Sequence, residues 1–327
     1  MIITRAPVRV SFLGGATDYP EHFLQHGGAV LGTAIDKFAY IAVSKRFGKL
    51  FDHSIRIAYS KVEQTSTLDD IEHAPFRECL RYCEIYEDVE VNYFANLPAF
   101  TGLGSSSTFV VALLQALKAY KGQFIQGIDL AYEAIHIERN ILKENVGCQD
   151  QVFAAVGGFN VIEFRTERDI VVNRITLSAA RMQEFEEHLM LFFTGIKRSA
   201  GVIVKKQLSR INDNKERLMN MRRMVDEGYN ILTGSGSLVP FGELLHKSWM
   251  EKRSLDDSVT NNHIDDIYRT GLDCGAIGGK LLGAGGGGFI LFFVPPENKE
   301  KLRNRLNHLH EIPIKINAPG SQIISTI

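Results

Sequence analysis

The sequence has few cysteines, and their arrangement is not that of a structural metal site. Four occur in 327 residues, without the paired spacing of a zinc ribbon. Cys79 and Cys83 lie four residues apart in a helix-like stretch, but no second pair exists and His73 alone would not complete a ligand set. We therefore expect buried, unreactive thiols and assign no metal to them.

An excess of charge of one sign is also absent. The chain carries 37 Lys and Arg against 38 Asp and Glu, a formal net charge of -1. This balance gives no general attraction to nucleic acid or to an anionic membrane, so any phosphate binding must be local. No apolar run approaches the roughly 20 residues that span a bilayer, and the first residues, MIITRAPVRVSF, predict a strand rather than a signal peptide. We expect a cytoplasmic protein that binds neither nucleic acid nor membrane.

What is present is the composition and patterning of a globular α+β protein, with 45% hydrophobic and 23% charged residues. Alternating β-branched and aromatic residues predict strands, among them 9–12, 39–43, 89–94 and 157–164. Apolar residues at helical spacing predict helices over 108–121, 129–143, 202–225, 241–253 and 298–309. The length suits two domains, which we place at residues 1–175 and 176–327.

The most informative segment is residues 98–108, PAFTGLGSSST, between a predicted strand and a predicted helix. Its glycines let the backbone approach a ligand closely, and the free N–H groups of a helix N-terminus attract an anion. The lysine of the nucleotide-binding pattern GxxxxGK[ST] is missing, so this is not a P-loop. Helix capping would explain any single serine, but the whole run beside glycines predicts a phosphate-binding loop.

Two further glycine segments carry weaker signals. Residues 283–289, GAGGGGF, precede an apolar strand, and four consecutive glycines cost backbone entropy on folding. Either two backbones pass very close there, or the loop folds against a ligand and supports the phosphate loop; the sequence leaves both open. Residues 5–20, RAPVRVSFLGGATDYP, place Arg9 in a strand and Asp18 after a Gly-Gly turn, a pattern that a surface salt bridge would also give.

All three segments, in this order, resemble the signatures of the GHMP small-molecule kinases, a family that includes galactokinase, homoserine kinase, mevalonate kinase and phosphomevalonate kinase. Bacterial D-glycero-D-manno-heptose 7-phosphate kinases and fucokinase domains are most similar to the stretches RAPVRVSFLGGATDYPEHF, TGLGSSSTFVVALLQAL and GAGGGGFILFFVPP. Ala16 stands where that subgroup has a third glycine. The resemblance spans nearly the whole chain and implies a two-domain GHMP kinase fold, with ATP and the acceptor in the cleft between the domains.

The resemblance also implies roles for individual residues. Asp150 in GCQDQ matches the catalytic aspartate, and Arg9 matches the cation paired with it. Glu138 matches a carboxylate that ligates Mg²⁺ together with the Ser106 hydroxyl, and its separation from Asp150 is that of galactokinases. From the residues alone, Glu138 would be an exposed helical glutamate and Asp150 a loop or cap residue.

The remaining implied roles concern ATP, the acceptor and the third motif. The residues matched to the ATP phosphates are Gly102, Leu103, Gly104, Ser105, Ser106 and Ser107. The residues matched to the acceptor are Gly15, Thr17 and Asp18, and those of the third motif are Gly285, Gly286 and Gly287.

These expectations combine into an ATP- and Mg²⁺-dependent kinase that phosphorylates the anomeric hydroxyl of D-glycero-D-manno-heptose 7-phosphate, giving the 1,7-bisphosphate for nucleotide-activated heptose. The acceptor's own phosphate needs a cation, for which Lys197 and Arg198 beside a glycine turn are candidates, although a solvated helix start explains them as well. A neutral sugar such as fucose or galactose is the alternative acceptor, and a non-catalytic sensor of ATP and sugar is the alternative outside enzymes. The expected partner is this small molecule, and the sequence leaves a homo-oligomer open.

Overall fold

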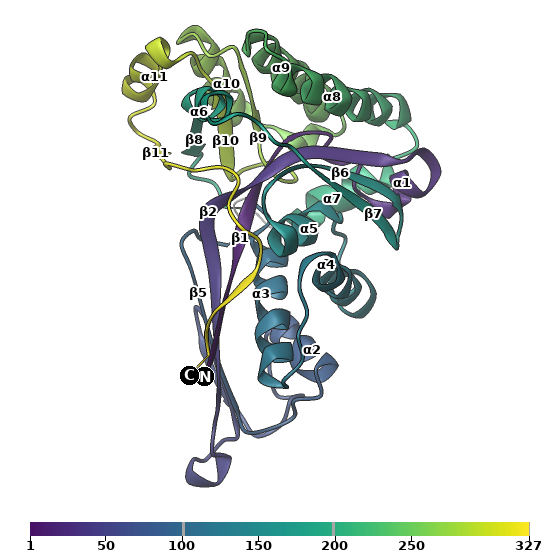
Figure 1. The fold of residues 1–327 in the computed structure, drawn as a ribbon, viewed down its shortest axis with the longest axis vertical. Coiled ribbons are helices and arrows are strands. Elements are labelled where there is room, and N and C mark those ends of the chain that lie inside the picture. Colours follow the sequence, from purple (N-terminus) through teal and green to yellow (C-terminus); the bar gives the residue numbers. More distant parts are fainter. Residues whose placement is uncertain (100–101, 198–199, 327) are drawn as a thin grey trace.

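The chain forms two β-sheets with helices packed on them, which confirms the predicted α+β class (Figure 1). The computed structural model describes residues 1–99, 102–197 and 200–326. In chain order, the strands are β1 (Ile2–Leu13), β2 (Gly28–Lys45), β3 (Ile55–Ala58), β4 (Val62–Thr65), β5 (Val89–Ala95), β6 (Phe159–Thr166), β7 (Asp169–Arg174), β8 (Leu189–Phe193), β9 (Gly278–Leu281), β10 (Phe289–Phe293), β11 (His310–Glu311) and β12 (Gln322–Thr326). The α-helices are α1 (Pro20–His26), α2 (Ala74–Tyr82), α3 (Ser105–Tyr120), α4 (Gly127–His136), α5 (Gln149–Val156), α6 (Ala179–Glu187), α7 (Ala200–Ser209), α8 (Lys215–Thr233), α9 (Val239–Arg253), α10 (Asn262–Asp273) and α11 (Lys299–Arg305).

Among the described residues, eight strands make up the larger sheet, in which the hydrogen-bonded path runs β12-β1-β2-β5-β3-β4. Strand β2 is long, and two different strands pair with it in succession: β6 with its first half and β5 with its second half. Strand β6 in turn pairs with β7. Helix α3 packs against β1 and β2, and its residues from Ser107 to Leu117 are buried. It is therefore a central helix on one face of this sheet.

Strand β1 lies in the middle of the molecule, which explains why its second half is buried without interruption. Residues 6–13 are all buried, whereas a strand with one solvated face would alternate. Helix α3 covers it on one side. Toward its end, the Phe12 ring contacts Phe185 at 5.3 Å and Phe241 at 5.9 Å between centroids, both from the second half of the chain. The two halves therefore share one apolar core, and this core fixes how they face each other.

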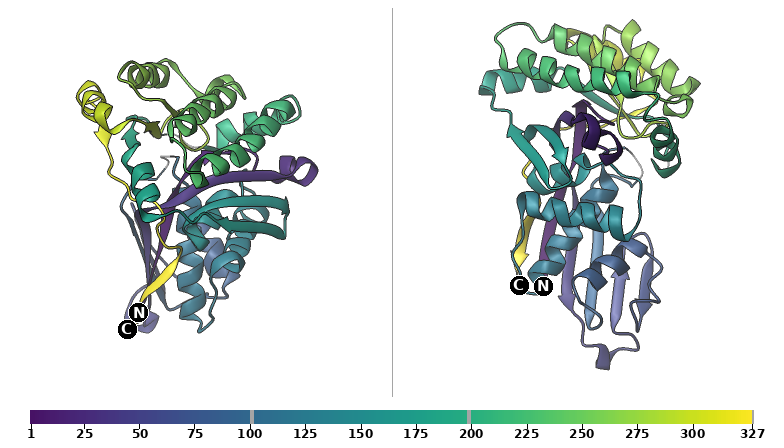
Figure 2. Two further views of the ribbon diagram at one scale, coloured as in Figure 1. Left: turned by 45° about the horizontal axis from the view of Figure 1, so that its top comes forward. Right: turned by 90° about the vertical axis from the view of Figure 1, so that its right-hand side faces the viewer.

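The smaller sheet has the order β11-β8-β10-β9 and is antiparallel throughout. All five residues of β10, FILFF, are buried, as expected for an apolar run at the centre of a covered sheet. Helices α8, α9, α10 and α11 gather around this sheet at one end of the molecule, and α2, α3 and α4 lie at the other end (Figures 1 and 2).

The change from one sheet to the other falls between Arg174 at the end of β7 and Leu189 at the start of β8. The boundary near residue 175 remains a proposal that this change of sheet supports. One segment returns to the larger sheet: β12 pairs with β1, with Ile2 opposite Thr326, so the two ends of the chain lie side by side in Figure 1.

One predicted helix is wrong as a single element. The range 202–225 contains the end of α7 at Ser209 and the start of α8 at Lys215, separated by a turn. The turn holds Asn-Asp-Asn at residues 212–214, residue types whose short polar side chains compete with helical backbone hydrogen bonds. Here Asn214 Nδ2 donates to the Leu255 carbonyl at 2.9 Å. None of the described helices is long and apolar enough to cross a membrane.

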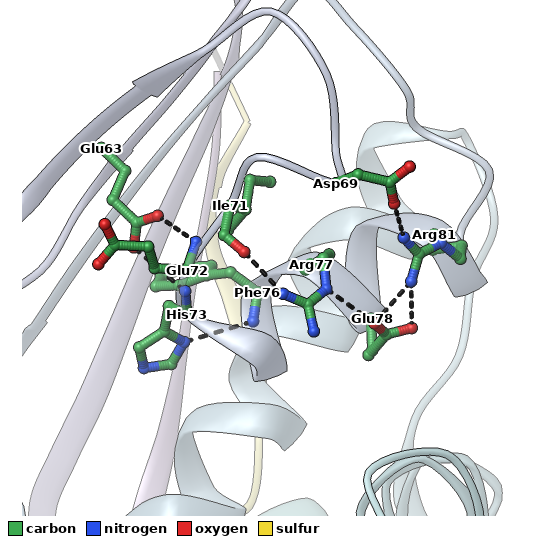
Figure 3. A network of polar contacts seen from close by, with 9 residues as sticks. All are labelled: Glu63, Asp69, Ile71, Glu72, His73, Phe76, Arg77, Glu78 and Arg81. Carbon is green, nitrogen blue, oxygen red and sulfur yellow. Dashed lines mark hydrogen bonds and ion pairs between the residues drawn. The ribbon is translucent and has the colours of Figure 1, made fainter.

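A polar network around α2 accounts for the histidine near the first two cysteines (Figure 3). The His73 Nδ1 accepts from the Phe76 backbone N–H at 3.4 Å and caps the helix. Cys79 and Cys83 are buried free thiols, and burial raises the pKa of Cys83 to about 12. The Nδ1 atom of His73 is therefore used as a helix N-cap acceptor.

Candidate active site

A cleft between the two halves of the chain brings together parts of all three glycine segments. Its first wall comes from β1 with the following turn, from the start of α3 and from the loop leading into α5, and is formed by Arg9, Ser11, Gly15, Ala16, Asp18, Tyr19, Gly102, Gly104, Ser105, Ser106, Ser107, Asn145, Val146, Gly147, Gln149 and Asp150. The opposite wall is formed by Val204, Gln207, Lys252, Lys280, Gly283, Ala284, Gly285 and Gly287.

Helix α3 opens on the cleft with an N-terminus that no described side chain caps. Its N-cap is Gly104, in the left-handed conformation with φ of 76°. Ser105 and Ser106 line the cleft in the first turn, where backbone N–H groups lack helical acceptors. An uncapped N-terminus offers these N–H groups and the positive end of the helix dipole to an anion. This arrangement supports the phosphate-loop interpretation over simple capping.

The third glycine segment lies directly against the phosphate loop. A Cβ on Gly283 would come within 2.4 Å of the Gly102 Cα, and a Cβ on Gly102 within 2.6 Å of the Leu282 carbonyl oxygen. Gly283, Gly285 and Gly287 also line the cleft. The two readings that the sequence left open are therefore compatible: two backbones pass very close, and the same loop forms part of the cleft wall.

Two predicted residues of these loops are not part of the described cleft lining. Leu103 is fully buried, and its carbonyl accepts from the Arg9 backbone N–H at 3.1 Å. Gly286 donates its backbone N–H to the Val259 carbonyl at 2.8 Å. Both residues hold the loop backbone in place, and neither side of the cleft includes them.

Arg9 and Asp150 meet as predicted, at the mouth of the phosphate loop. The Arg9 Nε lies 2.8 Å from Asp150 Oδ1, and its Nη1 donates to the Gly102 carbonyl at 2.8 Å. A β-bulge at Pro7 shifts the register of β1 just before Arg9, and bulges commonly redirect a side chain next to a site. Asp150 packs against Gly104, where a Cβ would lie 3.0 Å from the carboxylate. The ion pair is thus fixed beside the uncapped end of α3.

Asp18 is buried at the cleft wall, on the same side as Asp150. Its carboxylate accepts from the backbone N–H groups of Ala16 at 3.1 Å and Gln149 at 3.2 Å. Burial, followed by the charge of Asp150, raises the pKa of Asp18. A carboxyl held in this way is a well-oriented acceptor for the hydroxyl of a ligand.

Thr17 does not face the cleft, contrary to its predicted role in acceptor binding. Its hydroxyl lies 2.8 Å from the Gly14 carbonyl and 2.9 Å from the Ala29 carbonyl, and accepts from the Ala29 N–H at 3.1 Å. The side chain is fully buried. Because these backbone groups use its hydrogen-bonding capacity, Thr17 shapes the turn that positions Gly15 and Asp18.

Two buried polar side chains at the cleft were not predicted from the sequence, and their unpaired oxygens suit a ligand that carries hydroxyl groups. The Ser11 Oγ and Gln149 Oε1 are buried and have no hydrogen-bond partner among the described residues, and both residues line the cleft. Unpaired buried polar atoms are costly unless a ligand or water satisfies them. The signal for Ser11 was its position two residues after Arg9, which puts both on the same face of β1.

Glu138 lies in the π-helical turn Ile137–Ile141 and is completely buried, not an exposed helical residue. It accepts from Ser107 Oγ at 3.0 Å and Gln151 Nε2 at 2.5 Å. These are its hydrogen-bond partners among the described residues. The predicted ligation of Mg²⁺ by Glu138 and Ser106 stays a prediction. Burial raises the pKa of Glu138 to about 8.

Two lysines on the opposite wall were also missed. Lys252 on α9 and Lys280 on β9 are 5% and 1% exposed, and both line the cleft. No local pattern indicates either residue, since Lys252 lies in a mixed helix and Lys280 in a short strand next to the glycine segment.

The structure does not test the predicted cation pair at the glycine turn, Lys197 and Arg198. Lys197 is exposed and is not part of the described cleft lining. Arg198 lies outside the described residues. Their assignment to the phosphate of the acceptor therefore stays a prediction.

Comparison with known proteins agrees with this geometry. The family model of the GHMP kinases N terminal domain matches residues 74–158, and that of the GHMP kinases C terminal matches residues 230–311. The D-glycero-alpha-D-manno-heptose 7-phosphate kinase of Campylobacter jejuni is 30% identical over 92% of this chain and 91% of that protein. The L-fucokinase/L-fucose-1-P guanylyltransferase of Bacteroides fragilis is 26% identical over 92% of this chain and 35% of that protein.

Solved structures share the fold over the whole chain. A D-glycero-D-manno-heptose 1-phosphate kinase from Bacteroides thetaiotaomicron has a TM-score of 0.82 at 23% identity and covers 100% of both chains. Lactococcus lactis galactokinase in complex with galactose has a TM-score of 0.74 at 16% identity, covering 99% of this chain and 95% of that one. At these identities the likeness shows the fold alone.

Proposed function

Because this chain belongs to the GHMP kinase family and is an ATP-dependent sugar kinase, we propose that its acceptor is D-glycero-D-manno-heptose 7-phosphate. The reaction would phosphorylate the anomeric hydroxyl and give the 1,7-bisphosphate, a precursor for nucleotide-activated heptose. The observation that carries the proposal is the Arg9–Asp150 ion pair at the uncapped N-terminus of α3, next to the unpaired oxygens of Ser11 and Gln149. The similarity to the Campylobacter enzyme supports the choice of a heptose phosphate.

The site residues divide the chemistry between the two ligands. The first turn of α3 would bind the phosphates of ATP, which brings the γ-phosphoryl group beside Gly104 and Asp150. Asp150 would accept the proton of the acceptor hydroxyl, because a free hydroxyl is a poor nucleophile. Arg9 holds that carboxylate in place and would stabilise the charge that develops on the phosphoryl group. Asp18, Ser11 and Gln149 would orient the sugar through its other hydroxyls.

We also propose that Glu138 and Ser106 hold the Mg²⁺ of the Mg·ATP complex. Glu138 is a buried carboxylate with no cation partner among the described residues, and Ser106 presents an exposed hydroxyl to the cleft. Such hard oxygen donors fit Mg²⁺, which retains several waters and needs few protein ligands. The ion would neutralise charge on the phosphates when bound, and it would offset the cost of burying Glu138.

The proposed reaction is tested by measuring ADP release with phosphorylated and unphosphorylated hexoses and heptoses. We expect D-glycero-D-manno-heptose 7-phosphate to have the highest kcat/KM, and phosphorus NMR to place the new phosphate on the anomeric oxygen. A higher kcat/KM for a neutral sugar such as fucose or galactose would replace the proposed acceptor. Absence of ADP release with every acceptor would contradict the assignment.

Ser106→Ala is expected to lower kcat by roughly tenfold or more while ATP affinity changes less. The backbone N–H groups at the start of α3 remain in the variant, so the anion site persists, whereas the hydroxyl available to the metal is lost. Steady-state kinetics at saturating Mg²⁺ and a melting curve check this. Unchanged kcat and kcat/KM would remove Ser106 from the metal site.

Glu138→Gln is expected to raise the Mg²⁺ concentration for half-maximal activity by at least about tenfold, since one charged ligand is lost. The fold should persist, because a neutral amide costs less to bury than a carboxylate and Gln151 has a free Oε1 that can accept from it. Glu133→Gln on α4, whose partner is Lys118, is the control and should leave the Mg²⁺ requirement unchanged. A wild-type Mg²⁺ requirement in Glu138→Gln would count against the assignment.

A further inference from the structure

Two buried lysines face the cleft from the second half of the chain without a carboxylate partner. Lys280 Nζ donates to the Phe12 carbonyl at 2.8 Å, and Lys252 Nζ donates to the Gly283 carbonyl. Neither forms an ion pair with any described carboxylate. Buried charges are normally paired, because an unpaired ammonium loses its hydration without compensation.

Both lysines line the cleft and keep N–H donors that no described residue uses. An ammonium has three N–H donors, and each lysine uses one on a backbone carbonyl. Burial, followed by the positive charge of Arg9, lowers the pKa of Lys252 to about 8, and burial together with the charge of Lys252 holds the pKa of Lys280 well below its usual value. A bound anion would interact favourably with both ammonium groups and would therefore raise the pKa of each lysine again.

We propose that Lys252 and Lys280 form the site for the phosphate that the acceptor already carries, a deepening that rests on the proposed function. The nucleotide phosphates have their own site at the first turn of α3, on the facing wall. Lys280 donates to the carbonyl of Phe12, the residue that follows Ser11 on β1, and both lysines line the same cleft as Ser11, whose unpaired hydroxyl is assigned to the sugar. A dianion bound there would neutralise two cations in a chain with almost no net charge.

The test compares Lys252→Met and Lys280→Met with wild type, using D-glycero-D-manno-heptose 7-phosphate and the unphosphorylated heptose as acceptors. Methionine keeps most of the side-chain volume and removes the charge. We expect the ratio of kcat/KM for the phosphorylated over the unphosphorylated acceptor to fall by roughly ten- to a hundredfold, mainly through KM, while the KM for ATP changes less than about threefold. Lys252→Arg should restore part of the preference, because the charge is retained.

Lys299→Met is the matched control. Lys299 is partly buried and, like the two lysines, donates only to backbone carbonyls, those of Glu187 and Leu189 at 2.9 and 3.0 Å, but it is not part of the described cleft lining. This variant tests the cost of removing such a lysine from the fold, and it should keep the wild-type acceptor preference.

A measurement on the wild type keeps the proposal falsifiable if the variants fail to fold. Inorganic phosphate should inhibit competitively against the heptose 7-phosphate and not against ATP. Competition against ATP alone would assign the lysines to the nucleotide and overturn the proposal.

The remaining outcomes separate this inference from the proposed function. Equal losses with both acceptors, or a selective loss in Arg198→Ala with none in the lysine variants, would overturn the lysine site while the acceptor assignment stands. A wild type with no preference for the phosphorylated heptose would instead overturn the proposed acceptor.

Discussion

Asp150→Asn is expected to lower kcat by about 10²–10⁴-fold, the range typical of losing a general base, with little change in the Kd for ATP. The amide is nearly isosteric, and its oxygen can still accept the hydrogen bond from Arg9 Nε that the carboxylate accepts at 2.8 Å. Geometry is therefore retained while the capacity to take a proton is lost. The measurement is steady-state ADP release across a range of pH, combined with calorimetric titration of the nucleotide.

The control for this prediction is Asp129→Asn. Asp129 occupies the first turn of α4 as Asp150 occupies the first turn of α5, but it is exposed and is not part of the described cleft lining. Its replacement removes a carboxylate from the first turn of a helix but leaves the cleft unchanged, so turnover should stay at the wild-type value. Wild-type rates for Asp150→Asn at every pH would show that positioning, and not proton transfer, limits the reaction.

Gly283→Ala is expected to lower kcat/KM for ATP by at least about a hundredfold. The new Cβ would lie 2.4 Å from the Gly102 Cα and 2.8 Å from the Gly102 carbonyl oxygen, so the phosphate loop itself must move. A displacement of about 1 Å in a reacting group can cost two orders of magnitude in rate. The same carbonyl of Gly102 accepts from Arg9, so the shift would also disturb the ion pair with Asp150.

Gly122→Ala separates this contact from backbone strain. Gly122 has φ of 74° against 73° for Gly283, but a Cβ there would meet nothing within 4 Å. Both variants pay a similar conformational cost, about 1–2 kcal/mol for a left-handed residue, and only Gly283→Ala should lose activity. Similar activity in the two variants would mean that the close approach of the loops is not needed for catalysis.

Local patterns in the sequence predicted the phosphate loop. The pairing of Arg9 with Asp150 was predicted from the family resemblance. The loop is recognisable because positive φ and an open helix N-terminus require specific residues in consecutive positions. The ion pair joins residues 141 positions apart, and no local rule pairs them. The same limit explains why Ser11 and Gln149 were missed, since an unpaired oxygen is visible only once its surroundings are known.

The remaining differences have similar physical origins. The hydrogen bond between Ser107 and Glu138 was not predicted, because the rotation of α3 about its axis, set by packing, decides which serine turns inward. Thr17 was assigned to a ligand although neighbouring backbone groups use its hydroxyl. The helix over 202–225 was extended through Asn214 because its apolar spacing continued past the turn.

The pairing of β12 with β1 has a consequence for synthesis on the ribosome. Strand β1 is synthesised more than 300 residues before β12, so its outer edge pairs only when Thr326 reaches Ile2. Until then the nascent chain presents an apolar strand with unpaired N–H and C=O groups, a template for pairing with other chains. Contacts of such long sequence separation also slow folding. The larger sheet is therefore completed only after β12 has been synthesised, so protection of the nascent chain should matter most for β1.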